Sequence, residues 1–421
     1  QLSREELIAC GEDPDDPGGY FIVNGSERVI VAMEDLAPNR IIVDIDEKGA
    51  TPIHQAKMFS STVGFRARIE LKMKSDGAIQ VSMPGVPSEI PFVILIRALG
   101  LESDKEIAEA VSLKKEMQSE LEPSFEKALG VDTVKDAILF IGNRVAHGQV
   151  EEYRIQKAET VLDKNFLPHV GRTNQSRRDK AIFLGEMICR VIELNLGRRK
   201  TDDKDHFKNK RLRLAGPLLA DLFRVAFRNL IRDIKYQLER IGVKGPIITV
   251  SAAVRPGIIT ERLQHALATG NWGRGRVGVT QLLDRTNNIS ALSHLRRLQS
   301  PLSRSQPNFE ARDLHPTHWG RLCPNETPEG SNCGLVKNLA LSASISVSVN
   351  PEKTKQILYG MGVVSIYEAN EALRRSGAKV FVDGNIIGYC NFATELTREF
   401  RERRRRGEIS TEVNIAYFSK I

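Results

Sequence analysis

Arginine side chains gather in one stretch of the sequence, together with a histidine. Between Asn271 and Arg304, the chain carries six arginines against a single acid, Asp284. These arginines are Arg274, Arg276, Arg285, Arg296, Arg297 and Arg304. A guanidinium group presents a rigid fork of N–H donors that matches phosphate oxygens, and a neutral histidine such as His294 can donate without adding charge. The pattern therefore indicates contact with an anionic polymer.

The sequence around these arginines is irregular. Residues 281–339 are rich in Asn, Ser, Arg, His and Pro, and they have few of the alternating apolar residues that a packed strand or helix needs. Polar segments of this kind usually form surface loops that a rigid scaffold positions. We expect the arginines to lie on such loops.

Three short strings follow one another in this region. They are Ser293–Arg297 (SHLRR), His315–Arg321 (HPTHWGR) and Cys323–Gly330 (CPNETPEG). In this order they resemble the fork region of the second-largest subunit of multisubunit RNA polymerase. Trp319 and the run Cys333–Leu339 are closer to the archaeal and eukaryotic form than to the bacterial one. Further similar strings are Gly18–Val29, Phe166–His169, Asp205–Phe207 and Ala266–Gly273.

The resemblance implies an order of modules along the N-terminal half of such a subunit. Residues 1–45 and 206–270 are expected to form two segments of a protrusion, and residues 46–205 a lobe inserted between them. Residues 271–345 correspond to the fork and residues 346–421 to part of an external domain. The fold class is α+β and multidomain, with helices mixed with antiparallel sheets.

The resemblance also implies which residues face nucleic acid. Along the path of the nascent RNA it places Gln281, Asp284, His294, Arg297, Gln299, Glu329 and Asn332. Arg28 is expected to return from the first hairpin to the same wall, and Arg304 to lie in a second fork loop that borders downstream DNA. Glu329 would orient Arg297 or a nucleotide amine rather than bind phosphate.

Several other features have two interpretations. Arg274 and Arg276 lie in a Gly-rich turn, where they either contact phosphate or are solvated. The run Arg398–Arg406 is either a nucleic-acid patch or a solvated helix face. Asp284 is the obvious ion-pair partner of Arg297 if that arginine is structural.

Metal binding by this chain is not expected. The acidic spots Asp13–Asp16, Asp44–Asp46 and Asp202–Asp205 lack the Asp-x-Asp-x-Asp spacing that clamps two Mg²⁺ ions, so turns and caps are favoured. Cys323 and Cys333 are ten positions apart, whereas structural zinc sites use close Cys pairs. The resemblance implies that Mg²⁺ is held by the largest subunit of the assembled enzyme, and that no cofactor is bound here.

Composition fits an ordinary globular protein in a reducing compartment. The 421 residues are 41% hydrophobic and 27% charged, with a net charge of +8. Five scattered cysteines argue against a disulfide framework. No apolar run approaches the roughly 20 residues of a membrane span, and no signal peptide is recognisable, so we expect a cytoplasmic protein. The start at Gln1 suggests a fragment.

Hydrophobic periodicity predicts the elements. We expect a loop over 1–18, a hairpin around Asn24-Gly25, and a strand at 41–46. Alternation predicts a strand at 65–73 that turns at Asp76-Gly77. Other expected segments are short helices over 93–197, a charged linker at 198–213, a long helix from Pro217 to Gly242, strands at 247–254 and 339–349, and a hairpin around Asp383–Asn385.

The sequence thus predicts a subunit of DNA-directed RNA polymerase that is inactive by itself. Its partners would be the largest subunit, the rest of the second subunit, the assembly subunits, the DNA template and the RNA transcript. The alternative is an autonomous, non-enzymatic module that binds nucleic acid. Large exposed apolar patches would favour the subunit over the autonomous module.

Overall fold

The computed structural model describes residues 2–47, 51–244, 253–273 and 276–418. The chain forms two compact units, each built from two segments. Unit 1 comprises Gln1–Leu36 with Asp205–Ile345, and unit 2 comprises Ala37–Lys204 with Ser346–Ile421. Both units mix helices with mostly antiparallel strands, which confirms the predicted α+β, multidomain class. The five named modules stay a prediction.

The first sheet of unit 1 contains the predicted N-terminal hairpin. Its strands, in spatial order, are β1 (Phe21–Val23), β2 (Ser26–Ile30) and β10 (Thr280–Leu282). Val23 pairs with Ser26, so Asn24 and Gly25 form a two-residue turn with φ values of 49° and 74°. Positive φ at both positions is what a type I′ turn requires, and Asn-Gly supplies it with little strain.

The second sheet of unit 1 joins four distant segments. Its strands, in spatial order, are β12 (Val336–Asn338), β11 (Arg297–Gln299), β3 (Ala32–Leu36) and β9 (Lys210–Arg213). β11 is parallel to β3, and the other pairs are antiparallel. The linker prediction for 198–213 is therefore wrong at its end. Its charges there do not all face water, because Lys210 is bonded to the buried Glu34 carboxylate of β3.

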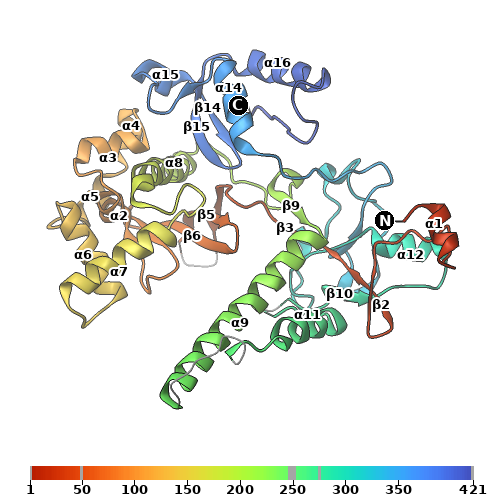
Figure 1. Cartoon of the computed structure of the whole chain (residues 1–421). Coiled ribbons are helices and arrows are strands. Elements are labelled where there is room, and N and C mark those ends of the chain that lie inside the picture. The colour runs from red at the N-terminus through yellow and green to blue at the C-terminus, as the bar shows by residue number, and fades with distance from the viewer. Residues whose placement is uncertain (1, 48–50, 245–252, 274–275, 419–421) are drawn as a thin grey trace. The chain divides into compact units, whose positions relative to one another are not determined.

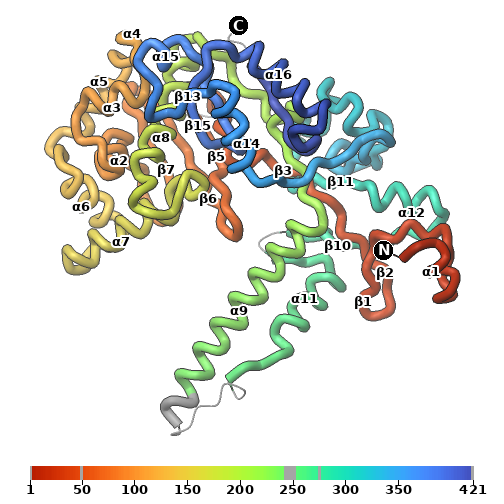
Figure 2. Tube along the Cα trace, turned by 45° about the horizontal axis from the view of Figure 1, so that its top comes forward, coloured from red at the N-terminus to blue at the C-terminus, as the bar shows by residue number. Residues whose placement is uncertain are grey.

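Helices form the rest of unit 1. They are α1 (Arg4–Ala9), α9 (Ala215–Lys244), α11 (Gly257–Thr269), α12 (Asn288–Leu295) and α13 (Phe309–Arg312), with 3₁₀ turns η2 (Phe207–Asn209), η3 (Pro316–His318) and η4 (Gly330–Asn332). α9 is the predicted long helix, although it continues past Gly242, and α11 lies beside it (Figures 1 and 2).

The sequence predicts a loop at 1–18 and a strand at 247–254 in unit 1. The loop predicted for 1–18 is wrong over α1, because Ser3 and Glu6 form a capping box that starts a short helix. The strand predicted at 247–254 lies mostly outside the described residues, and Ala253 is helical.

Unit 2 is built around a five-stranded antiparallel sheet. Its strands, in spatial order, are β4 (Ile42–Asp46), β5 (Ile53–Thr62), β6 (Phe65–Met73), β7 (Ile79–Ser82) and β8 (Ile90–Pro91). Alternation in β6 is confirmed, since Ala67, Ile69 and Leu71 are fully buried. The predicted turn at Asp76-Gly77 is also present, with Gly77 at φ 81°.

Short helices cover this sheet, as the sequence predicts. They are α2 (Phe92–Ala98), α3 (Asp104–Val111), α4 (Lys115–Ser119), α5 (Glu122–Glu126), α6 (Val134–Val145), α7 (Glu151–Lys164) and α8 (Arg177–Asn195), with the 3₁₀ turn η1 (Asn174–Ser176). α8 packs against β5 and β6 and is buried along most of its length. One continuous hydrophobic core joins the sheet to these helices.

The C-terminal segment of unit 2 has its own small core. Its elements are α14 (Pro351–Gly360), β13 (Val364–Ser365), α15 (Glu371–Ser376), β14 (Ala378–Val382), β15 (Asn385–Cys390) and α16 (Ala393–Arg405). The predicted hairpin is present, with Asp383 and Gly384 as the turn. The arginine run lies on α16, which buries Leu396 and Phe400, and this favours the solvated helix face.

The strand predicted at 339–349 is wrong. Only Leu339 is bridged, to Leu322, and the following residues up to Asn350 form no ladder. Leu341 and Val347 are 93% and 64% exposed, because no neighbouring strand is present to pair with them. None of the described helices has the length and hydropathy to cross a bilayer.

Candidate nucleic-acid interface

Three consecutive elements of unit 1 bring several predicted site residues together. β10 pairs with β2, α12 follows after a turn, and the chain then enters β11 directly. Asn287 caps α12, since its side chain accepts from the Ser290 amide at 2.8 Å while the Ser290 hydroxyl accepts from the Asn287 amide at 3.2 Å. This capping box fixes where the helix begins and therefore where His294, in its last turn, lies.

His294 is buried and bridges two other predicted residues. The backbone N–H of Asp284 donates to its Nδ1 at 3.1 Å, and its Nε2 lies 3.1 Å from Gln281 Oε1. Because Nδ1 accepts, the proton of the neutral ring is on Nε2 and is donated to Gln281. Burial lowers the pKa of His294, and the nearby Arg297 charge lowers it further against the opposing effect of Asp284.

The Asp284 carboxylate accepts hydrogen bonds from residues of the turn that follows it. It accepts from the Thr286 amide at 3.0 Å and from the Thr286 hydroxyl at 2.7 Å, with the Ser290 hydroxyl at 3.3 Å. These hydrogen bonds, led by the one from the Thr286 hydroxyl, hold the pKa of Asp284 below its ordinary value. No ion pair joins it to Arg297 within the described part of the chain.

Two glutamines connect this group to Arg304. Gln281 donates to the Gly278 carbonyl at 3.0 Å. In the amide orientation that satisfies both of its ends, Gln299 donates to the same carbonyl at 3.2 Å and accepts from Arg304 at 3.0 Å. Gln299 is the last residue of β11 and is only 8% exposed. The hydrogen bonds therefore connect the interior of unit 1 to the loop 303–308, which carries Arg304.

Arg297 is the cation of this group whose guanidinium has no partner among the described residues. It stands on β11 opposite Asn338, and its charge acts on His294. Among the described residues its guanidinium has no hydrogen-bond or ion-pair partner, unlike that of Arg296, which donates to the Leu339 and Ala340 carbonyls. A half-buried guanidinium with five unused donors is suited to bind an anion from outside the unit.

Arg28 lies on β2, which pairs with β10, but its side chain is on the opposite face of this sheet from Gln281. It pairs with Leu282, whereas Gln281 pairs with Val29. Residues directly opposite in an antiparallel pair point to the same face, and successive residues alternate. Arg28 and Gln281 therefore project from opposite faces of this sheet. The Arg28 Nε is buried and has no partner among the described residues.

The Gly-rich turn is only partly described. Arg274 lies outside the described residues. Arg276 is 3.5 Å from the Asp221 carboxylate of α9, and burial together with the nearby Arg213 lowers its pKa. This ion pair favours a structural role for Arg276.

Glu329 precedes the turn η4, and Asn332 is its last residue. Glu329 is exposed at the N-cap position, and Asn332 Oδ1 is buried without a hydrogen-bond partner in the described structure. Neither side chain contacts Arg297 within the described part of the chain. The predicted orientation of Arg297 by Glu329 stays a prediction.

The acidic segments and His315 bond to other groups of the protein. Asp202 accepts from the Val43 amide and from Arg199, and Asp15 and Asp16 serve turns or ion pairs. His315 accepts from the Thr317 amide at 3.1 Å. Within the described residues, no group of three or more His, Cys, Asp and Glu is arranged to hold a metal ion.

A buried charge cluster beneath the site was not predicted. Glu34 on β3 is 2% exposed and accepts from Lys210 at 2.7 Å and from Lys337 at 3.0 Å. Burial alone would raise the pKa of Glu34, but the two lysines outweigh it and hold that pKa below the ordinary value. Nothing local in the sequence signals this cluster, because its members come from three distant segments.

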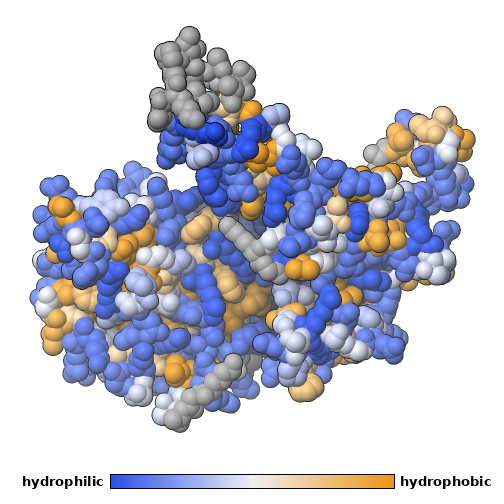
Figure 3. Space-filling model, turned by 90° about the horizontal axis from the view of Figure 1, so that it is seen from below, coloured by the Kyte–Doolittle hydropathy of each residue, from blue (hydrophilic) through white to orange (hydrophobic). Residues whose placement is uncertain are grey.

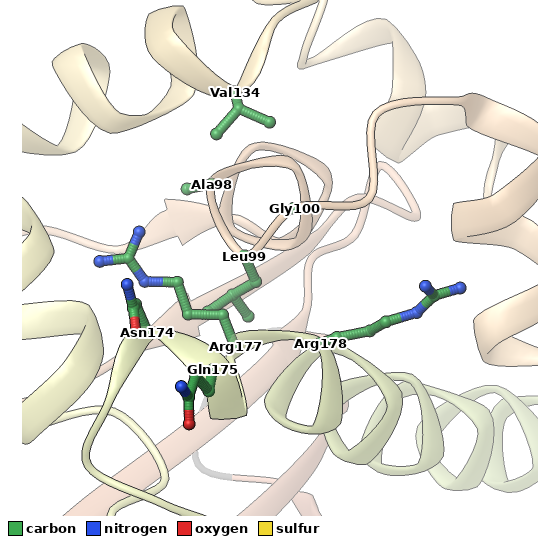
Figure 4. A pocket seen from close by; sticks show the side chains of 8 residues that line it. All are labelled: Ala98, Leu99, Gly100, Val134, Asn174, Gln175, Arg177 and Arg178. Atoms are coloured by element: carbon green, nitrogen blue, oxygen red, sulfur yellow. The ribbon is translucent and has the colours of Figure 1, made fainter. Parts of the chain in front are cut away.

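A shallow pocket of about 390 Å³ lies in unit 2 between α2 and the start of α8 (Figure 4). Arg177 on its wall is already bound by Asp163 at 2.7 Å and by Glu159 at 3.3 Å. Its charge is therefore compensated, and the pocket offers no evident chemistry.

Three family models match the chain. They are RNA polymerase Rpb2 domain 2 over residues 30–213, domain 3 over residues 281–345, and domain 4 over residues 380–421. The first match spans the whole of the first segment of unit 2, and the third spans part of its second segment. The second match spans the region from α12 to β12 in unit 1.

Relatives cover nearly all of the chain. The DNA-directed RNA polymerase subunit Rpo2 of Saccharolobus shibatae is 55% identical over 99% of this chain and 38% of its own length. The same subunit of Sulfolobus acidocaldarius is 53% identical over the same shares. Subunit Rpo2N of Methanococcus vannielii is 51% identical over 86% of this chain and 73% of its own length. The chain belongs to this family of second-largest RNA polymerase subunits, and it corresponds to their N-terminal half.

Proposed function

We propose that the chain works as part of a DNA-directed RNA polymerase, in which it forms one wall of the cleft for RNA and downstream DNA. The names of its relatives, subunits of DNA-directed RNA polymerase, support the enzyme class. The chain spans 38% of the length of the Rpo2 relatives, so the reaction belongs to a larger assembly. Its partners there are the largest subunit, the rest of the second subunit, the assembly subunits, the DNA template and the RNA transcript.

The observation that carries the proposal is the state of Arg297. Its donors are unused within the described residues, and the neutral His294 beside it adds no competing charge. A phosphate of the RNA backbone supplies the missing acceptor in a bidentate geometry. Gln281, Gln299 and Asp284 hold the histidine and the loops around it.

In this proposal the contribution of the chain to catalysis is positioning. The RNA 3′-hydroxyl attacks the α-phosphate of a nucleoside triphosphate, and pyrophosphate leaves. Holding the RNA in register keeps the attacking oxygen near the phosphorus and lowers the entropic barrier. Mg²⁺, which stabilises the charge of such reactions, would be held by the largest subunit, as the resemblance to this family implies. The assembly would work in the cytoplasm.

The surface favours a subunit over an autonomous module. Phe223, Phe227 and Ile231 of α9 are each 44–53% exposed and lie along one side of the helix, with the first two rings stacked at 6.0 Å. A monomer rarely exposes such a stripe. Hydrophobic residues also gather in several patches on the otherwise hydrophilic surface in Figure 3.

Replacing Arg297 tests the proposal. In the assembled enzyme, Arg297→Ala should increase the release of short transcripts at least about tenfold, because a charge-assisted hydrogen bond contributes roughly 1.5–3 kcal/mol. Loss of one phosphate contact should also reduce the slope of log affinity against log salt by about 0.7–0.9. Lysine should restore retention only in part, since it keeps the charge but loses the fork.

Arg285→Ala is the matched control. It removes the same charge from the same region, but Arg285 is bonded to Glu27 at 2.8 Å and to Asp16 at 3.0 Å. Its loss should leave transcript release and the salt slope nearly unchanged. Equal effects of the two substitutions would contradict a specific contact at Arg297.

A further inference from the structure

Arg312 lies at the junction of two loops of the candidate interface. At the end of α13, its guanidinium donates to five backbone carbonyls. Nε donates to Pro307 at 2.7 Å, Nη1 to Ser331 at 2.8 Å and Cys333 at 2.9 Å, and Nη2 to Arg304 at 3.3 Å and Gln306 at 3.2 Å. Three acceptors belong to the loop 303–308 and two to the turn 329–334.

These bonds use every donor that an arginine has. A guanidinium carries five N–H groups, and each has one acceptor here. Arg312 therefore has no donor left for phosphate, in contrast to Arg297. Its charge also interacts favourably with five carbonyl dipoles, which would otherwise depend on solvent.

The main chain of Arg312 forms a second contact with the turn. A Cβ at Gly334 would lie 2.3 Å from the Arg312 carbonyl oxygen and 2.5 Å from its Cα. The two backbones approach so closely only because Gly334 has no side chain, and Gly334 also has φ 72°. The Thr327 hydroxyl closes the same turn, accepting from the Gly334 amide and donating to the Val336 carbonyl, both at 2.9 Å.

We propose that Arg312 is a positioning residue that holds the loop 303–308 and the turn 329–334 together as one unit. The loop carries Arg304, and the turn carries Glu329 and Asn332. Through the bond from Arg304 to Gln299, this junction continues into the network of Gln281 and His294. The inference rests on the proposed function only for the consequence that Arg304 is presented to nucleic acid; the junction itself is independent of it.

Hydrogen exchange on the chain within its native assembly tests the junction. The amides of Cys333, Gly334 and Leu335 are bonded inside the turn and should report its opening. In Arg312→Ala they should exchange at least about tenfold faster, the change expected for losing one or more charge-assisted hydrogen bonds. Arg312→Lys should lie between, because an ammonium has three donors instead of five.

Amides of α12 provide the internal reference, because that helix is capped by its own residues. They should exchange at the wild-type rate in both variants. Wild-type exchange at Cys333–Leu335 in Arg312→Ala would overturn the proposal. If the alanine variant does not fold, the lysine variant decides: an accelerated turn beside an unchanged α12 supports the junction, and an unchanged turn overturns it.

A glycine pair tests the same junction from the other side. Gly330 and Gly334 both have positive φ, but a Cβ at Gly330 meets nothing within 4 Å. Gly334→Ala should therefore accelerate exchange of the amides of Ala311 in α13 and Asp313 at its C-cap, and Gly330→Ala should not. Equal effects would mean that only backbone strain is measured, which contradicts a close junction.

Retention of nucleic acid separates this inference from the proposed function. Arg312→Ala should weaken the hold on downstream DNA severalfold although the charge of Arg304 is kept. Faster exchange with unchanged DNA retention would leave the junction standing and would refute the proposed role of Arg304. Unchanged exchange with weakened retention would refute the junction and leave the nucleic-acid wall.

Discussion

At the scale of single residues, the arginines differ in what their donors already bind. Arg285 is bonded to carboxylates, Arg296 and Arg312 to carbonyls, and Arg276 lies beside Asp221. Arg297 alone among these has no partner in the described structure. The sequence predicted a cationic stretch correctly, but it could not separate these states, because a partner such as Glu27 lies far from Arg285 along the chain.

The neutral state of His294 leads to a prediction about pH. Its folded pKa is below its unfolded value of about 6.5. Below that value the unfolded state binds more protons, so the stabilisation from the neutral ring is present above about pH 6.5 and is lost as pH falls toward the folded pKa. The side-chain NMR signal of His294 should titrate below 6.5, and the Asp284 amide should exchange faster once the ring is protonated.

The His294→Gln variant assigns that signal and serves as the control. Glutamine can accept from the Asp284 amide but does not titrate in this range. The variant should keep the amide protected as pH falls from 7 to 5. A His294 midpoint at or above 6.5 would contradict the lowered pKa that burial and the Arg297 charge produce.

At the scale of elements, the second sheet of unit 1 supports the site. β11 carries Arg297 and Gln299 between β12 and β3, and the strands are only three to five residues long. Such short strands contribute few ladder bonds. The buried Glu34 carboxylate adds a link, because it joins β3 to Lys210 on β9 and to Lys337 on β12.

Neutralising Glu34 should therefore destabilise unit 1. Glu34→Gln leaves two buried ammonium groups with weaker acceptors, and breaking a buried ion pair typically costs about 3–5 kcal/mol. The free energy of unfolding from denaturant titration should fall by an amount of that order. Glu352→Gln, which removes an exposed carboxylate paired with Lys355, should change it by less than about 1 kcal/mol. A similar small change at both positions would show that the Glu34 cluster is not a stabilising link.

Elements with local signals were predictable. The Asn24-Gly25 and Asp383-Gly384 turns and the alternation of β6 depend on neighbouring residues, and all three are present. Elements that depend on distant partners were not. β9 is a strand only because β3 lies beside it, whereas residues 340–349 alternate apolar with polar side chains but have no partner strand. The Arg312 junction could not be predicted from the sequence for the same reason. Its five carbonyl acceptors belong to two other segments, and nothing beside Arg312 in the sequence indicates them.

At the scale of the whole molecule, each compact unit is assembled from two segments separated along the chain. β2 pairs with β10, and β3 with β11, across more than two hundred residues. Closing such loops costs chain entropy before any contact is gained. Residues 1–36 without 205–345 therefore keep the β1–β2 hairpin but lack β10, which pairs with β2, and β9 and β11, which pair with β3. The candidate interface depends on both segments being present.

The share of the relatives' length that the chain spans also bears on its activity in isolation. It spans 38% of the length of its Rpo2 relatives, and its proposed role is to hold nucleic acid rather than to supply catalytic metal. We expect the purified chain to incorporate no labelled nucleotide on a primed template with Mg²⁺ or Mn²⁺. Adding back the remaining subunits should restore incorporation, and the restored enzyme should show the transcript release caused by Arg297→Ala. Template-dependent incorporation by the pure chain would contradict the prediction, provided that it depends on this polypeptide. The Arg297→Ala chain, purified in parallel, distinguishes the two sources, because a contaminating polymerase would be equally active in both preparations.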